Sequence, residues 1–218
     1  EINALNEIPW WSKYSPQAQK LSQNYQNQAQ DITQLITTVT VTEKALNLVS
    51  KKPLSVKQWQ DIQKQAETAI TEFDQISLAH PLYPFTRRKA QRTQKYLNQV
   101  YQELAAERQG ISSLQSAEEG VKIALVRQKS AQSPKDWELV QSTWKTSIDR
   151  LRDVAPGTTA HLPAKQLLKT ALPAYYQARA RQQQETLAQN LYQQGINSAQ
   201  KAQKFTREQR WNDAVIAW

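Results

Sequence analysis

The densest run of charge in this sequence lies between Arg87 and Lys95. Its five cations are Arg87, Arg88, Lys89, Arg92 and Lys95. Guanidinium and ammonium groups spaced this closely attract phosphate, anionic lipid or an acidic protein. Nucleic acid is the less expected ligand, because no helix-turn-helix spacing, aromatic stacking platform or zinc finger accompanies the charge. Such a run is also typical of a solvated helix face, and the sequence leaves both interpretations open.

The two histidines, His80 and His161, lie in corresponding turns, and each lacks the second ligand at i+3 or i+4 that a helical metal site supplies. The absence of cysteine excludes disulfides, thiol catalysis and thiolate metal ligands. The sequence contains no glycine-rich phosphate loop, no nucleophile elbow and no carboxylate pair that spacing alone would bring together. We therefore predict that the chain is not an enzyme and has no cofactor, metal or small-molecule ligand.

Composition and charge favour a helical body over a large globular core. Among 218 residues only 4 are glycine and 39% are apolar, which suits an elongated helical chain. The net charge of +9 is uneven, with totals of −1 for residues 1–50, +5 for 51–101, zero for 102–163 and +5 for 164–218.

The clearest predicted helix covers residues 133–154. Ser133 has the hydroxyl of an N-cap, Pro134 suits the first helical position, and Asp136 places an acid near the positive helix end. Bulky apolar residues then follow at three- and four-residue steps, at Trp137, Val140, Trp144, Ile148, Leu151 and Val154. One face of this helix must therefore be buried.

The same pattern occurs three times. An earlier copy contains Ser55, Trp59, Ala66, Ala69, Ile70, Phe73 and Ile76, and a third begins with Thr206, Trp211, Ala214 and Trp218. Trp59 and Trp137 are 78 positions apart, and Trp137 and Trp211 are 74 apart. We predict a repeat of about 75 residues whose core includes Trp59, Phe73, Trp137, Trp144, Leu151, Trp211 and Trp218.

Long helices are predicted between these tryptophan helices. Residues 15–52 have a heptad pattern formed by Leu21, Tyr25, Ile32, Leu35, Val39, Leu46 and Val49. The β-branched tract at residues 36–42 lies inside this pattern and has no hairpin partner, which favours helix over strand. Ser55 and Gln58 predict a capping box for the first tryptophan helix. Further long helices are expected from about residue 86 to 130 and from about 164 to 205.

The predicted fold is all-α, with elongated antiparallel hairpins of long, coiled-coil-like helices. The expected parts are an irregular aromatic lead (1–14), a long heptad helix forming half a repeat (15–52), two hairpin repeats (53–132 and 133–205) and a truncated start of a third (206–218).

The aromatic lead contains the adjacent pair Trp10 and Trp11. One interpretation is an interfacial aromatic belt close to a membrane anchor, and the other is a strap packed on the first hairpin. The sequence begins at Glu1 without methionine, so we expect a signal peptide or membrane anchor to precede it. No apolar run in the chain approaches the ~20 residues that a membrane span requires.

Two resemblances follow from the tryptophan helices. Their shared motifs are Trp137-Val140-Gln141-Trp144 and Trp211-Ala214-Val215-Trp218. These resemble the first helix of a tetratricopeptide repeat, but the expected glycine is missing and the period is about twice the roughly 34 residues of that family, so its groove is not carried over. The glutamine-rich sequence from Ser55 to Trp218 is also similar to repeats of cyanobacterial membrane-anchored, extracytoplasmic proteins. That resemblance implies a scaffold in the envelope.

Two functions are compatible with these features. The first is a non-enzymatic scaffold or spacer, the soluble arm of a membrane-tethered protein in the periplasm or envelope, which contacts protein partners or another copy of itself. The second is a binding module for an anionic surface, either lipid headgroups or nucleic acid, through the basic helix starts. A free cytosolic start of the full-length protein would favour the second.

Overall fold

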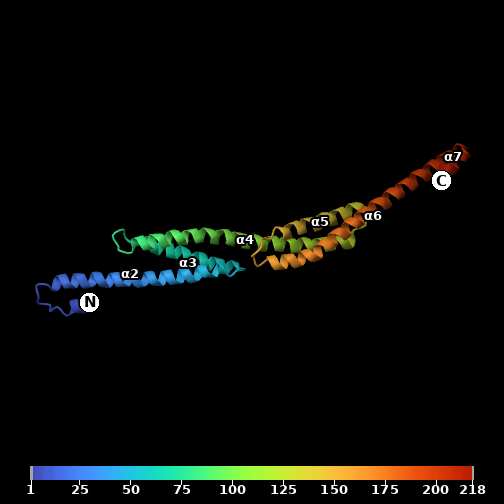
Figure 1. Cartoon of the computed structure of the whole chain (residues 1–218). Helices are drawn as coiled ribbons and strands as arrows, with labels where there is room; N and C mark the ends of the chain where they lie inside the picture. Colours follow the sequence, from blue (N-terminus) through green and yellow to red (C-terminus); the bar gives the residue numbers. More distant parts are fainter. Residues whose placement is uncertain (1, 218) are drawn as a thin grey trace. The chain divides into compact units, whose positions relative to one another are not determined.

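The computed structural model describes residues 2–217, and these residues form seven helices and no strand (Figure 1). The helices are α1 (Ile2–Asn6), α2 (Ser15–Leu48), α3 (Val56–Asp74), α4 (Tyr83–Ser130), α5 (Pro134–Arg152), α6 (His161–Arg207) and α7 (Trp211–Ala217). The predicted all-α fold is confirmed. The chain divides into two compact units, residues 1–107 and 108–218, and the boundary falls within α4.

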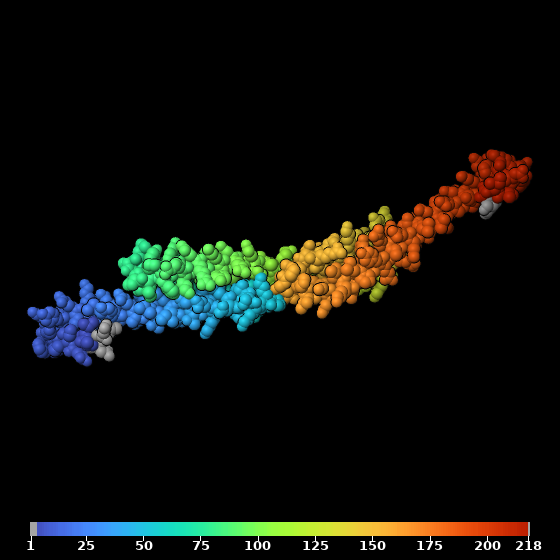
Figure 2. Space-filling view, viewed as in Figure 1, coloured from blue at the N-terminus to red at the C-terminus, as the bar shows by residue number. Residues whose placement is uncertain are grey.

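The first unit is a bundle of α2, α3 and the first part of α4. Trp59 and Ile62 of α3 pack in one apolar cluster with Val100 of α4, and Phe73 packs in a second cluster. α4 lies along α2 in the space-filling view, where green side chains border blue ones (Figure 2). The hydroxyl of Tyr101 on α4 donates a hydrogen bond of 2.6 Å to Glu67 on α3. The tryptophan helix is thus covered by two long helices.

The second unit repeats this arrangement with the rest of α4, with α5 and with the first half of α6. Its large core side chains come from α5, where Trp137, Trp144 and Leu151 are all buried. The long helices contribute small residues to the same cluster, namely Ala117, Ala124, Ala164, Ala171 and Ala178. Two long helices can approach α5 closely because their alanines leave room for its indole rings.

Capping boxes fix the starts of α3 and α5. The Ser55 hydroxyl accepts a hydrogen bond from the backbone N–H of Gln58, and the Ser55 N–H donates to the Gln58 side chain. Ser133 and Asp136 form the same pair of bonds 78 positions later. Each box satisfies backbone donors that a helix N-terminus otherwise leaves without partners. Both predicted caps are confirmed.

The β-branched tract at residues 36–42 is helical, as predicted. The hydroxyls of Thr37 and Thr40 donate to the carbonyl oxygens of Thr33 and Ile36, four residues earlier, over 3.0 and 2.8 Å. This back-bonding satisfies the threonine hydroxyls within the helix, and tertiary packing on α3 supplies the remaining stability.

Several predicted boundaries were wrong. The aromatic lead was expected to be irregular, but it contains α1, whose Asn6 accepts a hydrogen bond of 2.9 Å from the Ser22 hydroxyl on α2. α4 and α6 both begin about three residues earlier than expected, at Tyr83 and His161. In each case the backbone of the preceding turn leads directly into the helix, so the apolar pattern marks only the part of the helix that is packed.

The core position expected for Trp211 was also wrong, because this side chain is 61% exposed. Trp59 and Trp137 are the fourth residues of α3 and α5, whereas Trp211 is the first residue of α7. The fourth residue of α7 is Ala214, and it is buried. The third copy therefore places alanine where the other two place tryptophan. The core position predicted for Trp218 lies outside the described residues.

Candidate functional site

The five cations between Arg87 and Lys95 do not form one site, because two of them are paired with acids on neighbouring helices. Arg87 lies 3.2 Å from the Asp74 carboxylate at the end of α3. Lys89 lies 2.7 Å from the Glu43 carboxylate on α2. These two pairs connect the start of α4 to α3 and α2 and reduce the local positive charge.

The remaining three cations, Arg88, Arg92 and Lys95, define what we call the basic stripe. Their i, i+4, i+7 spacing places them on one face of α4, and all three are exposed. The Arg92 guanidinium lies 5.8 Å from the ring centre of Tyr96, within range of a cation–π interaction. Within the described residues, neither Arg88 nor Lys95 has a carboxylate at ion-pair distance. The basic stripe is thus available to an external anion.

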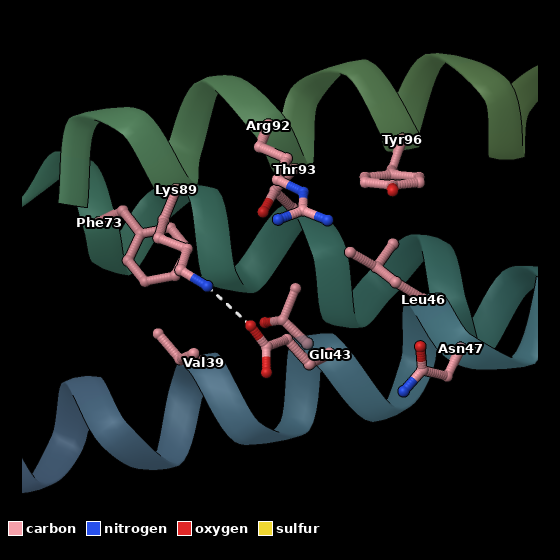
Figure 3. Close-up of a pocket in the computed structure, with 10 residues that line it drawn as sticks. Val39, Glu43, Leu46, Asn47, Phe73, Lys89, Arg92, Thr93 and Tyr96 are labelled. Atoms are coloured by element: carbon pink, nitrogen blue, oxygen red, sulfur yellow. Dashed lines mark hydrogen bonds and ion pairs between the residues drawn. The ribbon is translucent and has the colours of Figure 1, made fainter. Parts of the chain in front are cut away.

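A small polar pocket lies between α2 and α4, beside this stripe (Figure 3). It is lined by Val39, Thr42, Glu43, Leu46, Asn47, Phe73, Lys89, Arg92, Thr93 and Tyr96, and its volume is about 180 Å³. The hydrogen bond from Lys89 and its charge, with a smaller effect from Arg92, hold the pKa of Glu43 below its usual range. Because ligand pockets usually measure ~300–1,000 Å³, this pocket is better described as an ion-paired helix contact.

The adjacent pair Trp10 and Trp11 lies in the turn between α1 and α2. Their side chains are 85% and 73% exposed, so the two indoles are not packed on the first hairpin, although α1 of the same lead does contact α2. The turn itself is ordered by a hydrogen bond of 2.9 Å from the Ser12 N–H to the Pro9 carbonyl. Two exposed indoles on an ordered turn have the arrangement that membrane interfaces favour.

The second half of α6 presents an apolar face whose exposure the sequence did not predict. Leu191 and Tyr192 are 58% and 71% exposed, and Leu187 is also exposed. We call these three residues the C-terminal open face. In Figures 1 and 2 this stretch of α6 runs without a helix beside it until α7. The positions 78 residues before Leu191 and Tyr192 are Ser113 and Leu114 of α4, which are covered in the second unit, whereas Gln109, the counterpart of Leu187, is exposed.

The first half of α2 presents a matching surface. Leu21, Tyr25 and Ile32 are exposed and lie on one side of the helix; we call them the N-terminal open face. α4 begins 68 residues after α2, so Tyr25 and Ile32 correspond to Thr93 and Val100, which are buried. The heptad pattern predicted an apolar stripe here, and comparison with the later copies could have indicated that a neighbouring helix covers this position.

The histidines have local roles in their turns. His80 Nδ1 accepts a hydrogen bond of 3.1 Å from the Leu82 N–H, and His161 Nδ1 lies 3.4 Å from the Val154 carbonyl oxygen. Within residues 2–217 no three histidine, cysteine, aspartate or glutamate side chains converge as metal ligands. No helix in that range combines the length and apolar character needed to cross a membrane.

The surfaces of interest are therefore the basic stripe, the exposed Trp10–Trp11 pair and the two open faces. Comparisons with protein-family models, with curated proteins and with solved structures give no match for this chain.

Proposed function

We propose that this chain is a non-enzymatic helical scaffold or spacer that holds other protein helices against its long helices. It acts as the soluble arm of a membrane-tethered protein in the cell envelope.

The observation that carries the proposal is the exposure of apolar side chains at positions that are core positions elsewhere in the same repeat. Leu191 and Tyr192 correspond to covered residues of α4, yet both are more than half exposed. Large apolar side chains clustered on one helix face favour contact with another protein. A helical partner suits this face best, because α4 buries the corresponding face against helices.

The envelope part of the proposal is supported by two features. Trp10 and Trp11 project from an ordered turn, as an aromatic pair at a membrane surface does. The glutamine-rich repeats resemble those of cyanobacterial membrane-anchored, extracytoplasmic proteins. In this arrangement the Trp10–Trp11 pair lies close to the membrane, and the exposed apolar residues of α2 and α6 provide the surfaces for partners.

The basic stripe favours a second candidate function, binding to an anionic surface. Arg88, Arg92 and Lys95 form a line of exposed cations on one face of α4. Anionic lipid attracts such groups by about 1 kcal/mol per Lys or Arg near the surface. This function requires no pocket, since the contacts are electrostatic.

Localisation of the full-length protein, with protease treatment of intact and permeabilised cells, tests the envelope proposal. We expect membrane association and cleavage of the repeats once the outer barrier is opened while the inner membrane stays intact. A soluble cytosolic protein that is cleaved only after complete lysis would contradict the proposal. That result would favour the anionic-surface function, with nucleic acid as the ligand.

A further inference from the structure

We infer that the C-terminal open face of one copy of this chain binds the N-terminal open face of a second copy, head to tail, and that the contact completes a third three-helix bundle. The inference rests on the proposed scaffold function and names its partner as the chain itself. Its basis is the internal repeat. In the second unit the second half of one long helix packs with the first half of the next, and each open face is one side of an equivalent contact.

The template for this contact is present in the second unit. There the second half of α4 contributes Ala117 and Ala124 to the same core as Ala164, Ala171 and Ala178 of α6. The second half of one long helix thus packs with the first half of the next, and α5 fills the space between them.

The second half of α6, which carries the C-terminal open face, corresponds to the second half of α4 in this template. α6 begins 78 residues after α4, so Ala117 and Ala124 correspond to Gly195 and Ala202. Ala202 is buried, and α7 packs on α6, whereas Gly195 has no atom within 4 Å of the position a β-carbon would take. The helix that would lie over Gly195 is absent from the described chain.

α1 and the first half of α2 form the N-terminal hairpin, which corresponds to the end of α5 and the first half of α6 in this template. α2 begins 146 residues before α6, and the same offset relates Leu5 to Leu151 and Ile8 to Val154. The side chains at the end of a tryptophan helix therefore recur in α1 and in the turn that follows it. The hairpin of α1 and α2 has the same pattern as the hairpin that covers α4 in the second unit.

The open positions correspond residue by residue. The shift of 146 aligns Ala18, Tyr25 and Ile32 of α2 with Ala164, Ala171 and Ala178 of α6, which belong to the same second-unit core as Ala117 and Ala124 of α4. Tyr25 and Ile32 are bulkier than the alanines they replace, and Leu191 is bulkier than Ser113. Larger side chains suit this contact, because α7 is shorter than α5 and fills less of the space between the long helices.

Charge and symmetry also favour this pairing. Residues 1–50 total −1 and residues 164–218 total +5, so contact between opposite ends avoids the repulsion that two positively charged C-terminal ends would cause. The two faces differ from each other, so the contact is heterologous, and a dimer joined by one such contact retains one free face of each kind. The chain therefore associates as its concentration rises, either as an open series or as a closed ring.

Disulfide trapping tests the register of this contact. In the second unit a β-carbon on Gly110 would lie 3.5 Å from the β-carbon of Thr158, within the ~3.5–4.5 Å of a disulfide. Ala188 lies 78 residues after Gly110, and Ser12 lies 146 residues before Thr158. The corresponding pair is therefore Ala188 of one copy and Ser12 of the next. The chain has no cysteine, so A188C and S12C each introduce a single thiol. We expect a mixture of the two variants to form a disulfide-linked heterodimer under mild oxidation.

The matched control is N190C, which lies on α6 roughly 200° around the helix from Ala188. N190C mixed with S12C should form far less of the linked dimer. If A188C alone forms a disulfide-linked homodimer in the same yield as the A188C–S12C heterodimer, the pairing is symmetric and the inference is overturned. Equal yields from A188C and N190C would also overturn it, provided that circular dichroism shows the wild-type helix content in all variants.

Sedimentation velocity provides a test without cysteines. L191E/Y192E removes the C-terminal open face, and Y25E/I32E removes the N-terminal open face. We expect each variant alone to be monomeric and their mixture to form a dimer and nothing larger, because each contributes the face that the other lacks. Loss of association in the mixture would contradict head-to-tail pairing.

A wild-type chain that stays monomeric at every concentration would overturn this inference, but it would leave the proposed scaffold function open to a different protein partner. The localisation experiment described for the proposed function remains independent of that outcome. The two failures are therefore distinguishable.

Discussion

Gly120 of α4 packs directly against Ser147 of α5, so closely that a β-carbon on the glycine would overlap the serine hydroxyl. Ser147 is itself buried, and its hydroxyl donates a hydrogen bond of 3.0 Å to the Thr143 carbonyl within α5. The glycine thus allows the long helix to approach the tryptophan helix closely. This relationship favours close packing over a hinge as the role of Gly120.

G120A should destabilise the second unit by about 1 kcal/mol, because Ser147 must give up its hydrogen bond or the helices must separate. G195A is the matched control. A β-carbon at Gly195 would meet no atom within 4 Å, so this change should stabilise the helix by about 0.5–1 kcal/mol. Urea denaturation followed by circular dichroism measures both effects. If S147A fails to restore the stability lost in G120A, the overlap is not the cause.

W137A should destabilise the chain by about 3–5 kcal/mol, since Trp137 is buried between two long helices and truncation leaves a cavity. W211A should change the free energy of unfolding by less than about 0.5 kcal/mol, because its side chain is largely exposed on α7. The comparison uses the same chemical change at two copies of one motif. Equal losses of stability would contradict the burial assigned to either tryptophan.

The capping box of α5 should make the second unit sensitive to acid. Hydrogen bonds from the Ser133 hydroxyl and from the backbone N–H groups of Ser133 and Gln132 hold the pKa of Asp136 below its usual range. A lowered folded-state pKa stabilises the fold above the unfolded-state pKa, and this stabilisation is lost as the pH falls through the folded-state value. Unfolding measured from pH 6 to pH 2 should therefore show a loss that begins below about pH 4.

D136Q is the variant that isolates this effect. Glutamine occupies the corresponding position, Gln58, in the capping box of α3, so the substitution introduces a cap that the chain already uses and that does not titrate. The variant should lose less stability between pH 6 and pH 2 than the wild type does. An unchanged pH profile would assign the acid sensitivity to other carboxylates.

R88Q/K95Q should weaken binding to vesicles that contain anionic lipid, whereas R87Q/K89Q should have a smaller effect. Both variants remove two positive charges, but only Arg87 and Lys89 are already paired with carboxylates. Exposed charges are screened over about 8 Å at physiological ionic strength, so co-sedimentation at low salt gives the clearest measurement. Equal binding by the two variants would indicate that the basic stripe is a solvated helix face.

The helical class and the buried tryptophans could be predicted because local signals determine them. Ser133, Pro134 and Asp136 form a cap from adjacent residues, and the spacing of Trp137, Trp144 and Leu151 specifies one buried face. The β-branched tract in α2 was assigned to helix correctly because its heptad spacing outweighed its strand propensity.

The open faces could not be predicted in the same way, because exposure depends on which neighbouring helix is present. Leu191 and Leu151 have the same residue type and lie in similar patterns, yet only Leu151 has helices on both sides. The pairing of Arg87 and Lys89 with Asp74 and Glu43 also depends on tertiary contacts. The error at Trp211 arose because the third copy was aligned with the others by its tryptophan. The buried position is instead the fourth residue of each helix, which in α7 is Ala214.

Photo-crosslinking in cells, with a photoreactive residue at position 191 of the full-length protein, tests most directly whether another protein helix covers the C-terminal open face. Position 193 lies about 200° away on α6 and provides the control. We predict a defined crosslinked product from position 191, with the linked residues at regular helical spacing in the partner, and little product from position 193. An absence of product at position 191, in a protein that is folded and present at normal levels, would contradict the scaffold function.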